Sequence, residues 1–126
     1  MLNHVVQMGR LCADPDLRYT QSGTPVTTFR IAVDRDFVSK DTGERAVDFF
    51  TCVAWHGSAE FVSKFFRKGM MVIVSGRLQN REFTDREGIN RTVTEIVANN
   101  VYFGEKKAKE SGAGQFTGLD DEEFPV

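Results

Sequence analysis

The sequence predicts an all-β domain with one short helix, folded as a five-stranded barrel and followed by a disordered acidic tail. Five segments show the residue alternation of β-strands, and the turns between them are too short for repeated parallel crossovers. A single segment, between the third and fourth strands, has the period of a helix. Beyond residue 104 the composition becomes polar and contains the Gly and Ser residues of an unfolded linker.

The first three strands are expected within residues 1–55. Residues 3–12 are rich in β-formers, and Asp14-Pro15-Asp16 ends them with turn chemistry. Residues 26–36 alternate apolar and polar side chains, so one face is expected in the core and the other in water. After a polar loop, residues 47–55 are apolar on both faces and are expected to be covered on both sides.

A helix and two further strands follow. The helical period is carried by four apolar residues, Phe61, Val62, Phe65 and Phe66. Ser58 is placed to cap this helix and Gly69 to end it. Residues 70–83 and 90–98 are predicted to form a hairpin joined by a turn at 84–88, with Tyr102 and Phe103 closing the core.

Three strands, a helix and two strands are the order of an OB-fold barrel. A small α+β sandwich is the alternative architecture. The predicted organisation is a folded domain over residues 1–104, a short linker over 105–118 and an acidic tip over 119–126.

Charge is divided unevenly along the chain. Residues 1–109 hold all 16 Lys and Arg and 13 of the 18 acidic residues, a net charge of +3, whereas residues 110–126 hold five acids and no base, a net charge of −5. The body is therefore mildly basic although the whole chain has a net charge of −2. Because binding depends on local fields, the overall acidity does not exclude a nucleic-acid partner.

Other features narrow the class of protein. No apolar run reaches the length of a membrane span and residues 1–10 lack the pattern of a signal peptide, which predicts a cytoplasmic protein with no membrane partner. Cys12 and Cys52 have neither the spacing of a zinc site nor that of a disulfide framework, so both are expected as buried thiols, with no metal and no cofactor.

Aromatic rings and arginines are interleaved in a way that predicts a single-strand nucleic-acid surface. Strand alternation places Arg77, Gln79, Arg81 and Phe83 in one row. Phe37 follows a cation at Arg35, and Phe49 and Trp55 share a face of their own strand. We predict that the four rings, Phe37, Phe49, Trp55 and Phe83, stack bases. A single Phe considered alone is better explained as part of the core, and it is the settings of the four together that favour stacking. Phe29, Phe61, Phe65 and Phe66 are assigned to the core.

Basic residues expected to hold the phosphate backbone are spread over several strands and loops, as a groove following a nucleic-acid strand requires. They are Arg10, Arg30, Arg35, Lys40, Arg77, Arg81 and Arg91.

Signals of catalysis are absent. The chain has no phosphate-binding GxxxxGK[ST] loop, no HExxH motif and only two histidines, His4 and His56. Asp14 and Asp16 suggest a metal-dependent nuclease, but the proline between them favours a turn. We predict a protein that is not an enzyme.

The sequence resembles the bacterial-type single-stranded-DNA-binding protein family over residues 1–103. The resemblance is carried by an ordered series of short segments: Met1-Leu2-Asn3, Val5-Val6, Gly9-Arg10-Leu11, Asp14-Pro15-Asp16-Leu17-Arg18-Tyr19-Thr20, Thr28-Phe29, Ala32-Val33, Asp48-Phe49, Cys52-Val53-Ala54-Trp55, Ala59-Glu60, Lys68-Gly69, Ser75-Gly76-Arg77-Leu78-Gln79 and Thr94-Glu95-Ile96-Val97-Ala98.

The resemblance implies a function in DNA replication, recombination and repair, in association with the nucleoid. It also implies a homotetramer of OB-folds with the N-terminal strand at a subunit interface, and base stacking on Phe37, Phe49, Trp55 and Phe83. Phe50 is left open between the core and a subunit contact. The remaining alternatives are an RNA-binding or primosome-type OB protein and a scaffold that binds DNA only weakly.

The tail departs from the family pattern. Family tails are longer and end in an acidic cluster followed by Pro-Phe, through which partner enzymes are recruited. Here the residues assigned to partner binding are Asp120, Asp121, Glu122, Glu123, Phe124 and Pro125, and the aromatic precedes the proline. If partners clamp a C-terminal Phe ring together with its carboxylate, this tip is expected to dock poorly or to suit a different set of partners. The alternatives are a solubilising tail and a tail that competes with DNA for the basic groove.

Overall fold

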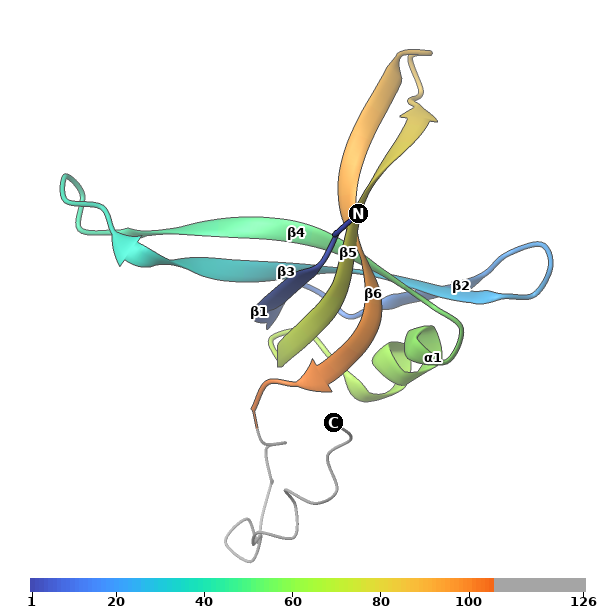
Figure 1. Cartoon of the computed structure of the whole chain (residues 1–126), viewed down its shortest axis with the longest axis horizontal. Coiled ribbons are helices and arrows are strands. Elements are labelled where there is room, and N and C mark those ends of the chain that lie inside the picture. The colour runs from blue at the N-terminus through green and yellow to red at the C-terminus, as the bar shows by residue number, and fades with distance from the viewer. Residues whose placement is uncertain (106–126) are drawn as a thin grey trace, which may run out of the picture.

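The computed structural model describes residues 1–105 (Figure 1). The predicted linker beyond Glu105 and the acidic tip lie outside these residues. In chain order the elements are β1 (Val5–Leu11), β2 (Asp16–Tyr19), β3 (Pro25–Val38), β4 (Arg45–Trp55), α1 (His56–Phe65), β5 (Met71–Thr84) and β6 (Asn90–Phe103).

Five of these strands close into a barrel. The sheet order is β1-β5-β6-β4-β3-β2, and β1 also pairs with β3. Strand β1 pairs with β5 from Val5 to Arg10 and with β3 at Arg10 and Leu11, which joins the two sides of the sheet. All pairings are antiparallel except that of β4 with β6. The predicted OB-type barrel with one helix is confirmed.

Strand β2 was not predicted. It pairs with β3 from Asp16↔Thr28 to Tyr19↔Pro25 and extends the sheet beyond the barrel. Its four residues are mostly exposed, so no apolar alternation marks it in the sequence. Tertiary pairing with β3 makes this segment a strand.

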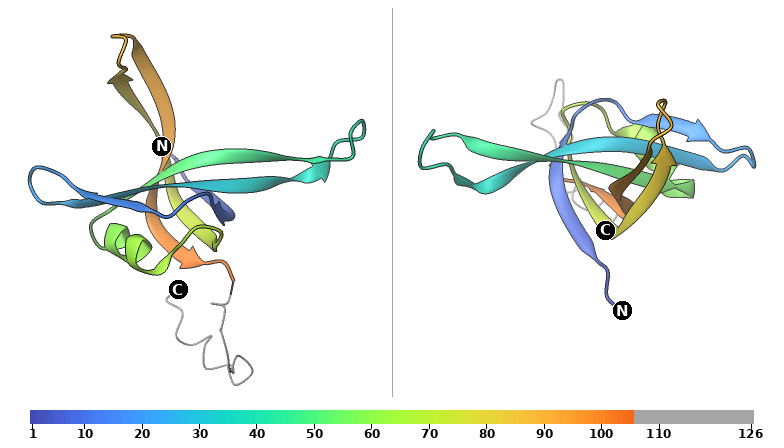
Figure 2. Two further views of the ribbon diagram at one scale, coloured as in Figure 1. Left: turned by 180° about the vertical axis from the view of Figure 1, so that it is seen from behind. Right: turned by 90° about the horizontal axis from the view of Figure 1, so that it is seen from above.

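Two pairs of strands continue past the barrel as hairpin arms. The β3–β4 pairing extends to Val38↔Arg45 and the β5–β6 pairing to Thr84↔Asn90. The arms leave the barrel in different directions (Figures 1 and 2). Strands β3 and β4 extend further into their arm than predicted, because backbone pairing in an arm requires no apolar face. Strand β6 is longer than predicted at its barrel end, where residues 100–103 pair with residues 72–75.

The core lies between the inner faces of the strands and helix α1. The buried apolar residues include Phe29 and Ile31 of β3, Cys52 and Ala54 of β4 and Phe66 after the helix. The remaining members of this core are Leu11, Ala59, Val62, Val72, Val74, Ile96, Ala98 and Val101. Helix α1 is tied to β3 by a hydrogen bond that the buried Thr27 hydroxyl donates to the Ala59 carbonyl, at 2.8 Å.

Aromatic residues complete the core beneath the helix. Phe103 stacks on Phe66 with ring centroids 4.7 Å apart, as its predicted place at the end of the core requires. Phe50, which the sequence left open, packs against the core from the inner face of β4. Phe61 packs there as predicted, but Phe65 is 43% exposed, with the Lys64 Nζ 5.6 Å from its ring centroid. The assignment of Phe65 to the core is therefore wrong.

The predicted helix limits are also wrong. The helix begins at His56, whose φ of 58° turns the chain out of β4, and Trp55 is the N-cap without a side-chain hydrogen bond. Ser58 instead donates to the Asn99 carbonyl at 3.5 Å. The helix ends at Phe65, and Gly69 takes a positive φ of 89° in the turn that follows. The C-terminal end is closed locally, by the Phe66 N–H donating to the Val62 carbonyl at 3.0 Å.

The two cysteines differ in burial. Cys52 is fully buried in the barrel, and burial raises the pKa of its thiol to about 12. Cys12 is only half-buried, so the prediction of two buried thiols holds for Cys52 alone.

Gly76 marks the point where β5 passes from the barrel into its arm. The register shifts from Ser75↔Asn100 to Gly76↔Ala98, which leaves Asn99 as the extra residue of a β-bulge. A Cβ atom on Gly76 would lie 2.0 Å from the Val97 carbonyl oxygen. Only glycine allows the two backbones to approach this closely.

We expect Gly76→Ala to lower the free energy of unfolding by about 2 kcal/mol, because relief of this overlap requires the two backbones to move apart. Urea denaturation followed by circular dichroism measures the change. Gly57→Ala is the matched control, since a Cβ at Gly57 meets no atom within 4 Å. Equal stability of the two variants would contradict the proposed close approach.

Candidate nucleic-acid interface

The outer face of β3 and β4 carries two of the four predicted rings. Strand register places Phe49 opposite Ala32 and Trp55 opposite Val26, on the face turned away from the core. Phe49 is 53% exposed and Trp55 is 39% exposed. The expectation that this strand is covered on both sides holds only in part within residues 1–105: Val53 on the outer face is buried, but Phe49 and Trp55 are not.

The other two rings lie on the arms. Phe37 stands near the end of β3 and is 85% exposed, and Phe83 stands near the end of β5 and is 40% exposed. Burial of apolar area is favourable in proportion to that area. The exposed rings therefore offer a surface on which a flat apolar ligand would gain free energy by covering them.

Arginines lie over two of these rings. The Arg30 guanidinium carbon is 4.9 Å from the Phe49 ring centroid, and the Arg81 guanidinium carbon is 5.6 Å from that of Phe83. Arg30 is on β3 and Phe49 on β4, so the first pair is formed across strands. Cation–π contacts of this kind hold both groups in a fixed orientation at the surface.

The row predicted on β5 is present. Arg77 donates to the Gln79 amide oxygen at 3.3 Å, and Arg81 contacts Phe83, so residues two apart meet along one face of the strand. On β6, Glu95 lies opposite Gln79 and Arg91 lies opposite Phe83. The row of polar and aromatic side chains on β5 therefore continues onto β6.

A hollow of about 500 Å³ joins the two halves of this surface. The β5–β6 arm forms one side, and Thr28 of β3 and Thr51 of β4 form the other. These two threonines share the outer face of Phe49 and Trp55. The remaining lining residues are Arg81, Phe83, Asn90, Arg91, Thr92, Val93 and Glu95.

Several predicted phosphate contacts are already paired with acids. Arg35 donates twice to Asp48, at 2.9 Å each, and this hydrogen-bonded pair raises the pKa of Arg35 and lowers that of Asp48. Arg91 donates to Asp85 at 2.6 Å, which is the main cause of the lowered pKa of Asp85. Arg81 pairs with Glu95. These arginines present less net charge to a ligand than the sequence suggests.

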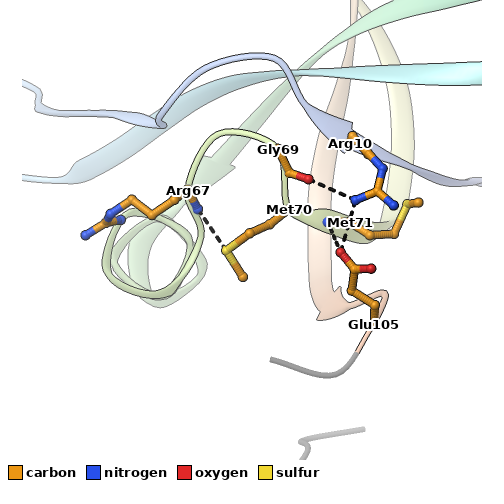
Figure 3. A network of polar contacts seen from close by, with 6 residues as sticks. All are labelled: Arg10, Arg67, Gly69, Met70, Met71 and Glu105. Carbon is orange, nitrogen blue, oxygen red and sulfur yellow. Dashed lines mark hydrogen bonds and ion pairs between the residues drawn. The ribbon is translucent and has the colours of Figure 1, made fainter. Parts of the chain in front are cut away.

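Arg10 is held at the place where the chain leaves the barrel. Its Nη1 donates to the Gly69 carbonyl at 2.9 Å and to Glu105 at 3.0 Å, and the same carboxylate oxygen accepts from the Met71 N–H at 3.3 Å (Figure 3). Its contacts among residues 1–105 are thus with the start of β5 and the chain exit, and not with any of the four rings.

Three predicted cations have no ion pair within residues 1–105. They are Arg30, Lys40 and Arg77. Arg30 and Arg77 lie on the two sides of the surface, beside Phe49 and along the β5 row. These are the side chains best placed to contact phosphate groups.

Sequence reasoning missed the polar lining of the hollow and the buried carboxylate of Glu95. The threonines and asparagine are ordinary strand and turn residues, so nothing in the pattern distinguishes them. Glu95 does leave a signal: a hairpin turn at residues 84–88 places it opposite Gln79, in the arginine row.

Two further findings concern the described residues. None of the helices within them is long and apolar enough to span a membrane. Across residues 1–105, no cluster of three or more His, Cys, Asp and Glu side chains is arranged to hold a metal ion.

Comparison with known proteins places the chain in a family. Residues 2–104 match the model of the single-strand binding protein family. The chain is 50% identical over 107 residues to single-stranded DNA-binding protein 2 of Listeria monocytogenes, covering 85% of this chain and 66% of the relative. It is 46% identical over 118 residues to single-stranded DNA-binding protein A of Bacillus subtilis, covering 94% of this chain and 66% of the relative. It thus spans about two-thirds of the length of these curated relatives, and it belongs to the single-strand binding protein family.

Proposed function

We propose that this protein binds single-stranded DNA without sequence specificity and acts without catalysis. The observation that carries the proposal is the set of four rings exposed on the outer face of the barrel and on its arms. Relatives in the same family are named for single-stranded DNA binding. Every base has a flat face, so rings that stack bases accept any sequence.

Stacking also explains a preference for single strands. Bases in a duplex are already stacked on one another and cannot reach Phe37, Phe49, Trp55 and Phe83. In a single strand, each stacked base is worth about 1–3 kcal/mol by alanine substitution. Arg30, Arg77 and Lys40, which have no ion pair within residues 1–105, then hold phosphates of the same strand.

The proposal extends to the oligomeric state of the protein and to its place in the cell. Strand β1 pairs with β3 only at Arg10 and Leu11, and Val6 and Met8 on its earlier part are exposed. An exposed strand edge of this kind is a surface on which a second copy can pair. It supports self-association of the chain. We propose a homotetramer that lies in the cytoplasm, associates with the nucleoid and protects DNA during replication, recombination and repair.

Recruitment of replication, recombination and repair proteins belongs to the same proposal. The residues that would carry it are the acidic cluster Asp120–Glu123 with Phe124 and Pro125. Their charge is opposite to that of the body, so they do not add to the DNA-binding surface.

The first test is a fluorescence titration with oligo-dT. Trp55 is the only tryptophan and lies on the outer face, so stacking should quench its emission and saturate at a fixed number of nucleotides per subunit. Raising salt should weaken binding with a log–log slope of about −0.7 per neutralised phosphate. Unchanged fluorescence during tight binding would show that DNA binds to another face of the protein.

A second test removes one ring. Phe49→Ala should weaken oligo-dT binding by about fivefold to 100-fold, because one base loses its stacking partner. Phe65→Ala is the matched control, since Phe65 is a similarly exposed ring on the helix. Fluorescence anisotropy with a labelled oligonucleotide measures both. Equal losses in the two variants would show that the outer face of β4 is not the stacking surface.

A third test concerns the tip. Deletion of residues 119–126 removes four acids and no base, so DNA affinity should stay the same or rise, while binding to a partner enzyme should be lost. Anisotropy measures the first effect, and co-purification with the replication and repair enzymes of the source cell measures the second. Reduced DNA affinity after deletion would contradict the assignment of the tip to partner binding.

A further inference from the structure

The hollow between the β5–β6 arm and the barrel contains a buried carboxylate. Glu95 is only 3% exposed, although it lines the proposed DNA-binding surface. A buried charge is tolerated only where a partner neutralises it and satisfies its hydrogen bonds. A carboxylate is also the least suitable group to place beside a phosphate backbone, so its presence here requires a reason.

Arg81 is the partner of this carboxylate. Its Nε donates to both Glu95 oxygens at 3.2 Å, and its Nη2 donates to Oε2 at 2.9 Å. The Arg81 side chain is itself half-exposed, and its Nη1 has no acceptor among residues 1–105. Glu95 thus holds the Nε–Nη2 edge of the guanidinium, and Arg81 remains part of the lining of the hollow.

The held guanidinium stands beside Phe83. Its central carbon is 5.6 Å from the Phe83 ring centroid, and both side chains line the same hollow. A guanidinium is planar and stacks on bases as well as binding phosphates. Because two of its nitrogens are bonded to Glu95, the orientation of the guanidinium over the Phe83 ring is restricted.

We propose that Glu95 is a positioning residue for DNA binding, which fixes Arg81 beside Phe83 so that guanidinium and ring together receive one base. This inference rests on the proposed function. It adds a role in DNA binding for an acidic residue, whereas DNA contacts are usually basic or aromatic. The alternative is that Arg81 is a phosphate contact that Glu95 merely weakens.

The two roles predict opposite changes in DNA affinity for the Glu95→Gln variant. The substitution keeps the side-chain shape and removes one negative charge from beneath the proposed DNA-binding surface. If Arg81 contacts phosphate, the Glu95→Gln variant binds oligo-dT more tightly than the unmodified protein, and its affinity falls more steeply with salt. If Glu95 positions Arg81, binding weakens by about twofold to tenfold and the salt slope stays the same. Affinity equal to or above that of the unmodified protein overturns the proposal.

Glu82→Gln is the matched control for charge. Glu82 is exposed on β5, next in sequence to Arg81 and on the alternate face of the strand. It loses the same charge without touching the pair, so DNA affinity should stay level or rise slightly. A loss equal to that of Glu95→Gln would overturn the positioning role.

A double variant tests whether Glu95 acts through Arg81. Arg81→Gln should weaken binding, and adding Glu95→Gln to it should cause no further loss, because the group to be positioned is already gone. A further loss of the same size would overturn the proposal. Thermal unfolding of each variant confirms that the assayed protein is folded.

Arg81→Lys decides the question if Glu95→Gln does not fold. Lysine keeps the charge opposite Glu95 but has no planar face, so the proposal expects the same twofold to tenfold loss. Unchanged affinity refutes it. Failure of the proposed function is a separate result: the unmodified protein would then not bind oligo-dT, and Phe83→Ala would change nothing.

Discussion

Closure of the barrel is the constraint on which the rest of the structure depends. Strand β1 must approach both β5 and β3, and at this crossing a Cβ on Gly9 would lie 2.5 Å from the Ala32 carbonyl oxygen. Further along the same β1–β5 pairing, Gly76 lies opposite Val5 and allows a similarly close approach of β5 to β6. Glycine at these two crossings brings the strands together tightly enough to enclose one continuous core. Once the sheet is closed, every strand has an inner face committed to that core and an outer face that is not.

The separation of faces produces the candidate interface. On β4, Cys52 and Ala54 are buried while Phe49 and Trp55, one residue out of phase, stand in solvent. The same backbone alternation therefore builds the core and displays the rings, without any added loop or domain. The arms extend the outer face beyond the barrel, which places Phe37 and Phe83 on ribbons that are anchored at one end by the closed sheet.

Local patterns predicted what depends on local geometry. The period of two identified the strands of the barrel and the shared row of Arg77, Gln79, Arg81 and Phe83, because these follow from neighbours along one strand. The same reasoning failed where distant contacts decide. The polar segment of β2 becomes a strand only by pairing with β3, and the helix begins at His56 because the chain must leave β4 there. Arg35 and Asp48 are 13 residues apart, and Arg81 and Glu95 are 14 apart, so these pairs depend on hairpin register that composition does not reveal.

These ion pairs change how the interface should be understood. A count of seven candidate cations suggests binding dominated by phosphate contacts, yet Arg35, Arg81 and Arg91 face acids of the same protein on their own arms, and Arg10 is bound to Glu105. A paired arginine releases few counterions when DNA arrives, because its charge is already balanced. Its planar group stays in a fixed orientation and remains able to stack. The affinity of such a surface depends on ring and guanidinium faces more than on net charge. This is consistent with residues 1–105, in which 13 Lys and Arg are balanced by 13 Asp and Glu.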